Sequence, residues 1–539
     1  MPETLNERIL TGVPVSGGSV LGVCHRLADK RFTRVKGNPG EEAVALRNAI
    51  SRAGKELEEL SAGLDRLAAE ILEFQQVLLE DDDLLEPVFS RIDSGESADG
   101  AWAAVFAGEI AEYQAADDEY MAARAADLGD LRDRVLRALS APQSAGDTPP
   151  DGAIVVAGDL TPSAFLELDW TRLSGAALGA GSATSHVSIL ARARGVTMVV
   201  GLGELDETPS GATLALDGRT GTMIVAPSSE TRARFQERIA QEAGLKAQEA
   251  EIARKPAITR AGRKIRVLVN VDDPSILDTL DPDICDGIGL TRTEFLFSEG
   301  PPDEETQLQA YETIVRWANG RPVTIRTLDA GGDKPVPGVT LDGEQNPFLG
   351  VRGLRLSLLD RSLFRVQLRA IARAARLGPV KLMVPMVTAP FELEEAREEL
   401  DLAIAELSKE GLAHARPECG IMIETPAAAL TAADWDADFY SIGSNDLIQY
   451  VTACARDNPN LAKLADPCNP AVLELIGRTV AAGKARGVEV SLCGDMASSP
   501  ELVPLLLSLG LECFSVAPAQ VGPVKLAISS TEGDMANGE

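Results

Sequence analysis

Basic residues, cysteine and histidine are scarce in this 539-residue chain, and the first two scarcities argue against whole classes of function. The 51 lysines and arginines are outnumbered by 82 acidic residues, which gives a net charge of −31 at pH 7. Because phosphate groups would be repelled, this charge argues against general binding of nucleic acids or of anionic membrane surfaces. It permits a protein partner with a basic face.

Cysteine occurs seven times, scattered along the chain and without a CxxC pair. This odd, dispersed set argues against a disulfide framework and against a zinc site, and it is typical of a reducing cytoplasm. The N-terminus MPETLNERIL lacks the apolar core of a signal peptide, and no apolar run is long enough to span a bilayer. We therefore expect a cytoplasmic protein that does not insert directly into a membrane.

Histidine occurs three times, and one of the three stands in the segment GSATSHVSILARARG at 181–195. Small and hydroxyl residues precede His186, and a helical pattern follows it. Such residues leave an imidazole exposed, and the start of a helix supplies free backbone N–H groups that suit a phosphate. A neutral imidazole is a good nucleophile near pH 7. The segment therefore indicates a nucleophile beside a phosphate site, and a helix start with an incidental histidine is the alternative.

Hydrophobic periodicity divides the chain into two main parts. Residues 1–230 combine strand-like pieces with a helical stretch at about 38–141, which predicts an α/β domain with a helical insertion. Acids strongly outnumber bases in the insertion, a charge pattern that also suits a solvated helix face. Residues 231–258 favour a charged helical linker, rich in Ala, Glu, Lys and Arg.

The rest of the chain, 259–530 before a tail at 531–539, alternates continuous apolar runs with helical stretches. That alternation predicts a parallel sheet, and eight such units in about 275 residues predict a (β/α)8 barrel. A doubly wound open sheet is the rival fold. The eight runs are IRVLVNV (265–271), DGIGLTR (286–292), PVTIRTL (322–328), KLMVPMV (381–387), CGIMIET (419–425), DFYSIGS (438–444), VEVSLC (488–493) and CFSVAP (513–518).

Polar residues gather at the carboxyl ends of these runs, which in a barrel meet on one rim where active sites occur. Arginines there suit carboxylate and phosphate oxygens, carboxylates suit Mg²⁺, and a cysteine thiol can give a proton to carbon. We expect a small, doubly anionic phosphate ester as the substrate. Taken singly, each residue could instead form a structural ion pair or, for the cysteine, fill the core. The candidates are Arg292, Arg326, Arg352, Glu424, Asn445, Asp446, Arg456 and Cys493.

Long motifs follow one another along almost the entire chain: GVPVSGGSVLG, TSHVSILAR, GIGLTRTEFLF, IRTLDAGGDK, NPFLGVRGLR, IMIETPAAA, SIGSNDLIQY and LCGDMA. In these motifs and their order the chain resembles enzyme I of the bacterial phosphoenolpyruvate-dependent sugar phosphotransferase system. The resemblance implies phosphoryl transfer from phosphoenolpyruvate (PEP) to His186 and onward to the phosphocarrier protein HPr, with pyruvate as the other product. It also implies an insertion that docks HPr and a homodimer formed through the barrel.

Carried over residue by residue, the resemblance implies a role for each candidate. PEP would be bound by Arg292, Arg326, Arg352, Asn445, Asp446 and Arg456. Glu424 and Asp446 would hold Mg²⁺, and Cys493 would protonate the departing enolate. Thr161 matches a hydroxyl near the phosphohistidine. The chain departs from the family pattern at Ala183 (often arginine), Gln75 (often histidine) and Asp495 (usually glutamate).

Three other functions compete with this one. A close variant feeds a nitrogen-regulatory carrier, but that branch usually has a sensory domain before the α/β domain. A PEP synthase or pyruvate phosphate dikinase would need a further nucleotide-binding domain, and the chain has no phosphate-cradling Gly/Lys loop. A silent scaffold is disfavoured because the reactive residue types are all present.

Overall fold

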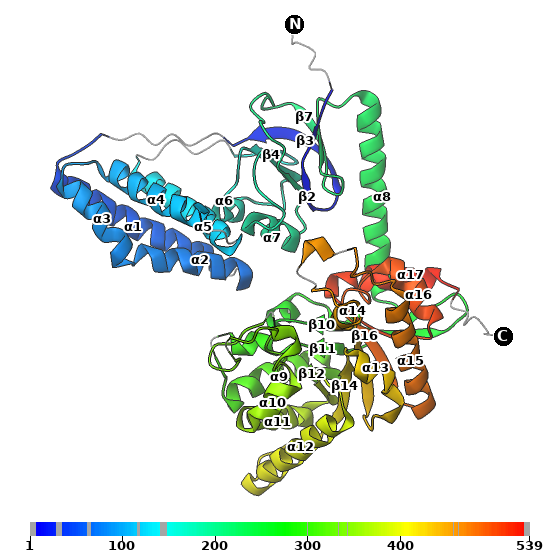
Figure 1. Ribbon diagram of the computed structural model, residues 1–539. Helices are drawn as coiled ribbons and strands as arrows, with labels where there is room; N and C mark the ends of the chain where they lie inside the picture. The colour runs from blue at the N-terminus through cyan, green and yellow to red at the C-terminus, as the bar shows by residue number, and fades with distance from the viewer. Residues whose placement is uncertain are drawn as a thin grey trace. The chain divides into compact units, whose positions relative to one another are not determined.

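The computed structural model describes residues 7–27, 35–61, 66–115, 119–140, 148–298, 300–332, 334–341, 343–455, 458–461 and 463–532. The chain divides into two compact units, Met1–Gly244 and Leu245–Glu539 (Figure 1). None of the described helices is both long enough and apolar enough to cross a membrane.

The first unit contains an eight-stranded mixed sheet with the order β1-β8-β7-β3-β4-β5-β6-β2. The central strands β3, β4, β5 and β6 are parallel, and the outer strands pair antiparallel with their neighbours. The strands are β1 (Arg8–Thr11), β2 (Val13–Ser16), β3 (Ser19–Arg26), β4 (Ile154–Ala157), β5 (Gly175–Leu178), β6 (Met198–Val200), β7 (Thr213–Asp217) and β8 (Thr222–Val225).

Apolar side chains cover both faces of this sheet. On one face, helices α6 (Pro162–Glu167) and α7 (His186–Ala193) pack Phe165 and Leu190 onto the parallel strands. On the other face, Leu214 and Met223 belong to a second core. Burial of large apolar side chains on each face, worth about 1.5–3 kcal/mol apiece, holds the turn before α7 in a fixed place.

Between β3 and β4, the described residues form a bundle of five helices (Figure 1). Its own core includes Trp102 and Phe106, whose rings stack with centroids 4.2 Å apart, together with Leu131. The insertion therefore has enough buried apolar surface to form a subdomain of its own. The helices are α1 (Pro39–Ser61), α2 (Arg66–Leu79), α3 (Asp82–Asp93), α4 (Ala98–Ala115) and α5 (Glu119–Leu139).

The second unit is a closed barrel of eight parallel strands. Each of β10 to β16 pairs with the next strand, and β17 pairs with β10, which closes the ring. The barrel prediction is confirmed, and the closing pair excludes the open sheet. The strands are β10 (Lys264–Val271), β11 (Ile288–Thr291), β12 (Val323–Arg326), β13 (Val380–Val384), β14 (Glu418–Ile423), β15 (Phe439–Gly443), β16 (Glu489–Cys493) and β17 (Cys513–Val516), with the short β9 (Ala257–Ile258) antiparallel to β10.

Helices surround the barrel and pack onto it through one large core. They are α9 (Glu304–Ala318), α10 (Leu354–Leu359), α11 (Arg361–Ala374), α12 (Pro390–Glu410), α13 (Pro426–Leu430), α14 (Ser444–Thr452), α15 (Pro470–Arg486), α16 (Val503–Ser508) and α17 (Val521–Ser530). Helix α8 (Ser229–Ala253) connects the two units in sequence.

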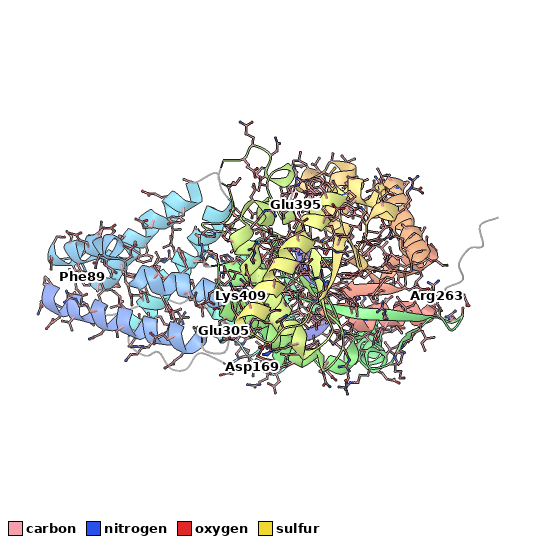
Figure 2. The ribbon with its side chains drawn as sticks, turned by 90° about the horizontal axis from the view of Figure 1, so that it is seen from below. Phe89, Asp169, Arg263, Glu305, Glu395 and Lys409 are labelled. Atoms are coloured by element: carbon pink, nitrogen blue, oxygen red, sulfur yellow. The ribbon has the colours of Figure 1, made fainter. Side chains whose placement is uncertain are left out.

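Arginines spaced four residues apart on α11 bind acids of the helices on either side. Arg361 pairs with Glu395 of α12, and Arg373 pairs with Glu305 of α9; both acids are labelled in Figure 2. Each surface pair contributes little alone, but the shared row ties α9, α11 and α12 together on the outside of the barrel. These ion pairs therefore help to keep the helices that support the barrel rim in fixed positions.

Candidate functional site

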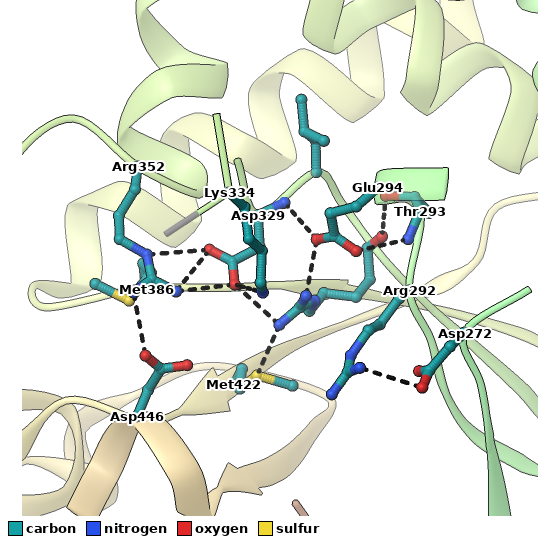
Figure 3. A network of polar contacts seen from close by, with 12 residues as sticks. Asp272, Arg292, Thr293, Glu294, Asp329, Lys334, Arg352, Met386, Met422 and Asp446 are labelled. Atoms are coloured by element: carbon teal, nitrogen blue, oxygen red, sulfur yellow. Dashed lines mark hydrogen bonds and ion pairs between the residues drawn. The ribbon is translucent and has the colours of Figure 1, made fainter. Parts of the chain in front are cut away.

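A network of charged side chains lies at the carboxyl ends of the barrel strands (Figure 3). Arg326 is one of its members. It is the last residue of β12, and its side chain is 4% exposed. Its Nη2 donates to Glu294 Oε1 at 2.8 Å, and its Nη1 lies 3.1 Å from Asp329 Oδ2. Its Nε is buried and has no hydrogen-bond partner among the described residues. A buried donor without a partner suits an oxygen of a bound ligand.

Asp329 follows β12 and is fully buried among cations. Both of its oxygens accept from Nη2 of Arg352, at 3.2 and 3.0 Å, and Lys334 Nζ lies 3.4 Å from Oδ2. Burial alone would raise the pKa of Asp329, but the charges of Arg326, Arg352 and Lys334 outweigh burial and hold that pKa well below its usual range. Asp329 is therefore a fixed anion that orients the guanidinium groups around it.

Arg352 links this cluster to α14, the helix that follows β15. Its side chain is fully buried, and its Nη1 donates to Asp446 Oδ1 at 3.1 Å and to the Tyr450 hydroxyl at 3.2 Å. Burial would lower the pKa of Arg352, but Asp329 and Asp446 raise it, so the group stays charged. Arg352 thus holds the carboxylate of Asp446, on the first turn of α14, in one orientation.

Glu424 follows β14 and is 1% exposed. Its Oε1 accepts from the backbone N–H of Met386 at 2.6 Å, and Met386 has a positive φ of 59°, a strained conformation for a side chain of this kind. A Cβ added at Gly443 would lie 2.9 Å from Glu424 Oε2, so the glycine leaves the space that this carboxylate occupies. Burial raises the pKa of Glu424, and the negative charges of Asp446 and Asp329 raise it further.

Glu424 and Asp446 fit a magnesium site that substrate would complete. The negative charge of Asp446 disfavours a second negative charge on Glu424, and a divalent cation would relieve this repulsion. Mg²⁺ prefers one or two carboxylates with phosphate and water. No group of three or more His, Cys, Asp or Glu among the described residues would hold a metal without other ligands. The pair therefore suits a metal that binds together with an oxygen-rich ligand.

Cys493 ends β16 and points into the barrel, where it packs with Leu290 and Met422. It is 3% exposed, and burial raises the pKa of its thiol to about 11. The Ser441 hydroxyl lies 3.8 Å from the sulfur. The thiol therefore keeps its proton at neutral pH, as a proton donor must.

Asn445 at the start of α14 is fixed by the loop after β16. Its Nδ2 donates to Asp495 Oδ2 at 3.2 Å, and its Oδ1 accepts from the backbone N–H of Asp495 at 2.9 Å. The Ser444 hydroxyl donates to the carbonyl oxygen of Cys493 at 2.7 Å. Asp495, where the family usually has glutamate, is long enough to orient this amide.

Two predicted arginines differ from the buried members of the network. Arg292 follows β11, its side chain is 40% exposed, and it pairs with the exposed Asp272 at 3.2 Å. It is thus able to exchange this partner for a ligand. Arg456 lies outside the described residues, so its role stays a prediction.

His186 belongs to the first unit, where it is the first residue of α7. Ser185 caps the helix, since its Oγ accepts from the N–H of Ser188. The imidazole is 20% exposed, and its Nδ1 lies 3.0 Å from Oδ1 of Asp127 on α5. Thr161, which resembles a family hydroxyl near the phosphohistidine, caps α6, since its Oγ1 accepts from the N–H of Ala164 at 3.3 Å.

Sequence reasoning singled out neither Asp329 and Lys334 nor Asp127. The first two stand in the motif IRTLDAGGDK directly after β12, and their place beyond a strand end was a signal that could have found them. Asp127 precedes His186 by 59 residues and lies on a helix of the insertion, so no sequence pattern links the two.

Family comparisons cover nearly the whole chain. Three family models match: "PEP-utilising enzyme, N-terminal" at 11–124, "PEP-utilising enzyme, mobile domain" at 149–221 and "PEP-utilising enzyme, PEP-binding domain" at 246–532. Several phosphoenolpyruvate-protein phosphotransferases are similar to this chain over most of both sequences. That of Geobacillus stearothermophilus is 35% identical over 97% of this chain and 93% of its own, that of Haloferax volcanii 39% over 84% and 80%, and that of Bacillus subtilis 34% over 96% and 94%.

Proposed function

The chain belongs to the PEP-utilising enzyme family, with phosphoenolpyruvate-protein phosphotransferases among its full-length relatives, and we propose that it transfers a phosphoryl group from PEP to His186 and then to an HPr-type carrier. The observation that carries this proposal is the network of arginines and carboxylates at the barrel rim, centred on Asp329. The N-terminal α/β domain with its insertion at about 38–141 supplies the histidine, and the barrel at 259–530 binds PEP.

In this mechanism the phosphate and carboxylate of PEP bind the guanidinium groups of Arg292 and Arg326. Arg292 exchanges its exposed partner Asp272 for substrate, and Arg326 offers the unpartnered Nε–H. Arg352 fixes Asp446, and Asn445 lines the same rim. Arg352, Asp446 and Arg456 complete the proposed PEP site. Phosphoryl transfer depends mainly on such positioning and on charge neutralisation.

The charges of the rim explain why a metal would be required. Among the described residues, Arg292, Arg326, Arg352 and Lys334 are balanced by Glu294, Asp329, Glu424 and Asp446. When Glu424 is ionised, as a metal ligand must be, the network has no surplus positive charge for a phosphate ester that also carries a carboxylate. Mg²⁺, when held by Glu424 and Asp446, supplies that charge and neutralises phosphate oxygens.

The chemical step moves one phosphoryl group and one proton. A ring nitrogen of His186 forms a bond to phosphorus as the P–O bond of PEP breaks, and the electron pair of that bond remains on the enolate oxygen. The enolate carbon then takes the proton of the Cys493 thiol, giving pyruvate, and the thiolate regains a proton from water. Because burial raises the pKa of Cys493 to about 11, the thiol stays protonated at neutral pH and so carries the proton that the enolate carbon takes.

The acceptor is an HPr-type carrier docked on the helical insertion, whose acidic character suits a basic partner face. We also assign the protein to the cytoplasm and expect a homodimer through the barrel, in keeping with the family resemblance.

Gln75, where many members have histidine, is buried and donates to Asp130 Oδ2 at 3.1 Å, so this departure lies inside the subdomain.

Helix α8 suits the movement that brings His186 to PEP. In the first unit, Glu242 accepts from the N–H and hydroxyl of Ser19 at 3.0 and 3.1 Å. In the second unit, Lys525 donates to the carbonyl of Ala253 at 2.7 Å. Residues 243–248 between these anchors are exposed, and a Cβ at Gly244 would meet no atom within 4 Å. Because glycine weakens a helix by about 1 kcal/mol, bending is easiest there.

The test is incubation of the full chain with Mg²⁺ and PEP labelled in its phosphate. We expect an acid-labile, base-stable phosphate on the protein, abolished in His186→Ala and retained in the matched controls His25→Ala and His414→Ala. Label that persists in His186→Ala would refute the assignment of the nucleophile. Adding sugar-type and nitrogen-type carriers separately then identifies the acceptor by which one gains label first.

A further inference from the structure

Asp127 presents a buried carboxylate to the proposed nucleophile from a different subdomain. It lies on α5 of the helical insertion, is 0% exposed, and its Oδ1 is 3.0 Å from Nδ1 of His186. Nε2 of His186 has no hydrogen-bond partner among the described residues. An ionised carboxylate only accepts hydrogen bonds, so a neutral imidazole in this arrangement carries its proton on Nδ1 and its lone pair on Nε2.

We infer that Asp127 is the positioning residue that selects the reactive tautomer of His186 and stabilises the ring during transfer. The inference rests on the proposed function, which makes His186 the phosphoryl acceptor. Nε2 forms the bond to phosphorus while the bond to the enolate oxygen breaks, and Nδ1 keeps its proton. The ring gains positive charge in this step, and the Asp127 carboxylate compensates that charge as the aspartate of a catalytic triad does for its histidine.

Neighbouring contacts hold Asp127 in this role. Arg124 Nη1 donates to the other carboxylate oxygen, Oδ2, at 3.4 Å, so the two oxygens have different partners. Gln75 Nε2 lies 3.5 Å from the Asp127 carbonyl, and it also donates to Asp130. Asp130 in turn accepts from the backbone N–H of Ser163 at 3.0 Å, which fastens α5 to the α/β part. The insertion that docks the carrier therefore also sets the state of the nucleophile.

The decisive variant is Asp127→Asn, which keeps the shape and removes the charge. Because Arg124 is a donor, it attracts the new amide oxygen, and the amide NH₂ then faces His186 Nδ1. That arrangement favours the tautomer with the proton on Nε2, in which the outward nitrogen has no lone pair to attack phosphorus. We expect phosphorylation of Asp127→Asn by PEP to be slower by about 10²-fold or more.

The matched control is Asp130→Asn, on the same helix, buried, and without contact to His186. Nitrogen-15 NMR of the imidazole in full-length protein without PEP reports the tautomer directly. We expect the Nδ1–H form in the wild type and in Asp130→Asn, and a shift towards the Nε2–H form in Asp127→Asn. The control should lose less than about threefold in rate, since it does not alter the tautomer.

Three results would overturn the inference: an Nε2–H imidazole in the wild type, an unchanged tautomer in Asp127→Asn, or equal slowing of both variants. The last result would mean that the two aspartates merely join the subdomains. The NMR measurement needs no substrate, so it can succeed even if the wild type takes no phosphate from PEP. A wild type that takes no phosphate from PEP would refute the proposed function and leave the Asp127–His186 pairing intact.

Discussion

Gly494 offers a direct test of how tightly the loop after β16 must fit the site. Its φ is +91°, and a Cβ built there would lie 2.6 Å from Asn445 Oδ1 and closer still to Ser444 Oγ. Gly494→Ala should therefore do two things. It places a side chain in a backbone region that costs about 1–2 kcal/mol, and it pushes apart the atoms that fix Asn445 and Cys493.

The size of the effect follows from the contacts at stake. The Ser444 hydroxyl donates to the Cys493 carbonyl at 2.7 Å, and a new methyl group would displace it. Loss of that buried hydrogen bond adds about 1–3 kcal/mol, for a total of roughly 2–5 kcal/mol. If the loop yields by about 1 Å, the proton donor is misplaced, and such a shift costs on the order of 10² in rate.

Gly487→Ala provides the matched control. Gly487 ends α15 with a similar φ of +68°, but a Cβ there would meet nothing within 4 Å. It should lose only the backbone cost of about 1–2 kcal/mol and keep its rate. Chemical denaturation gives the two stabilities, and pyruvate formation in the presence of carrier gives the two rates. Equal rates in Gly494→Ala and Gly487→Ala would refute the argument that this loop must fit closely.

Two further predictions concern the rim. Thiolate is the reactive form, and burial raises the pKa of Cys493 to about 11, so alkylation of Cys493 at pH 7 should be at least about tenfold slower than that of exposed Cys468. The rate at Cys493 should increase as the pH rises towards 11. Mass spectrometry of the labelled sites measures both rates, and equal labelling of the two cysteines would contradict the prediction. Glu424→Gln keeps an oxygen for the Met386 N–H but lacks the charge, so the Mg²⁺ concentration for half-maximal activity should rise about 10–100-fold. Glu418→Gln, at the exposed opposite end of β14, should leave that concentration unchanged.

Features that depend on local periodicity were predicted from the sequence. The eight apolar runs each overlap one barrel strand, because continuous apolar strands separated by helices have few other ways to be buried. The same reasoning identified Arg326 and Glu424 as rim residues, since both stand at strand ends. Their partners were not predicted, because which carboxylate meets which guanidinium depends on loop paths that no short pattern records.

Arg352 shows most clearly the difference between what local sequence patterns predict and what only the tertiary structure shows. From the motif NPFLGVRGLR it was assigned to substrate, and it is fully buried with donors directed at Asp329, Asp446 and Tyr450. Its position after β12 allowed us to predict that it lies at the rim. Its burial could not be predicted, because it depends on residues up to 98 positions away in the sequence. Likewise, no repeating pattern in the sequence relates α5 to the first residue of α7. The pairing of Asp127 with His186 could therefore be found only from the tertiary structure.

The buried and the exposed cations of the rim divide two tasks between them. Buried ion pairs such as Arg352–Asp329 contribute little net stability, because desolvation offsets most of the attraction. They do fix direction: with Asp329 anchoring the guanidinium groups, Arg352 holds Asp446 near Glu424 although the two carboxylates repel each other. Arg292, half-exposed and paired with Asp272, has no such restraint. Preorganised carboxylates beside one exchangeable cation are the arrangement that the proposed site needs, in which an anionic ligand and a metal would bind together.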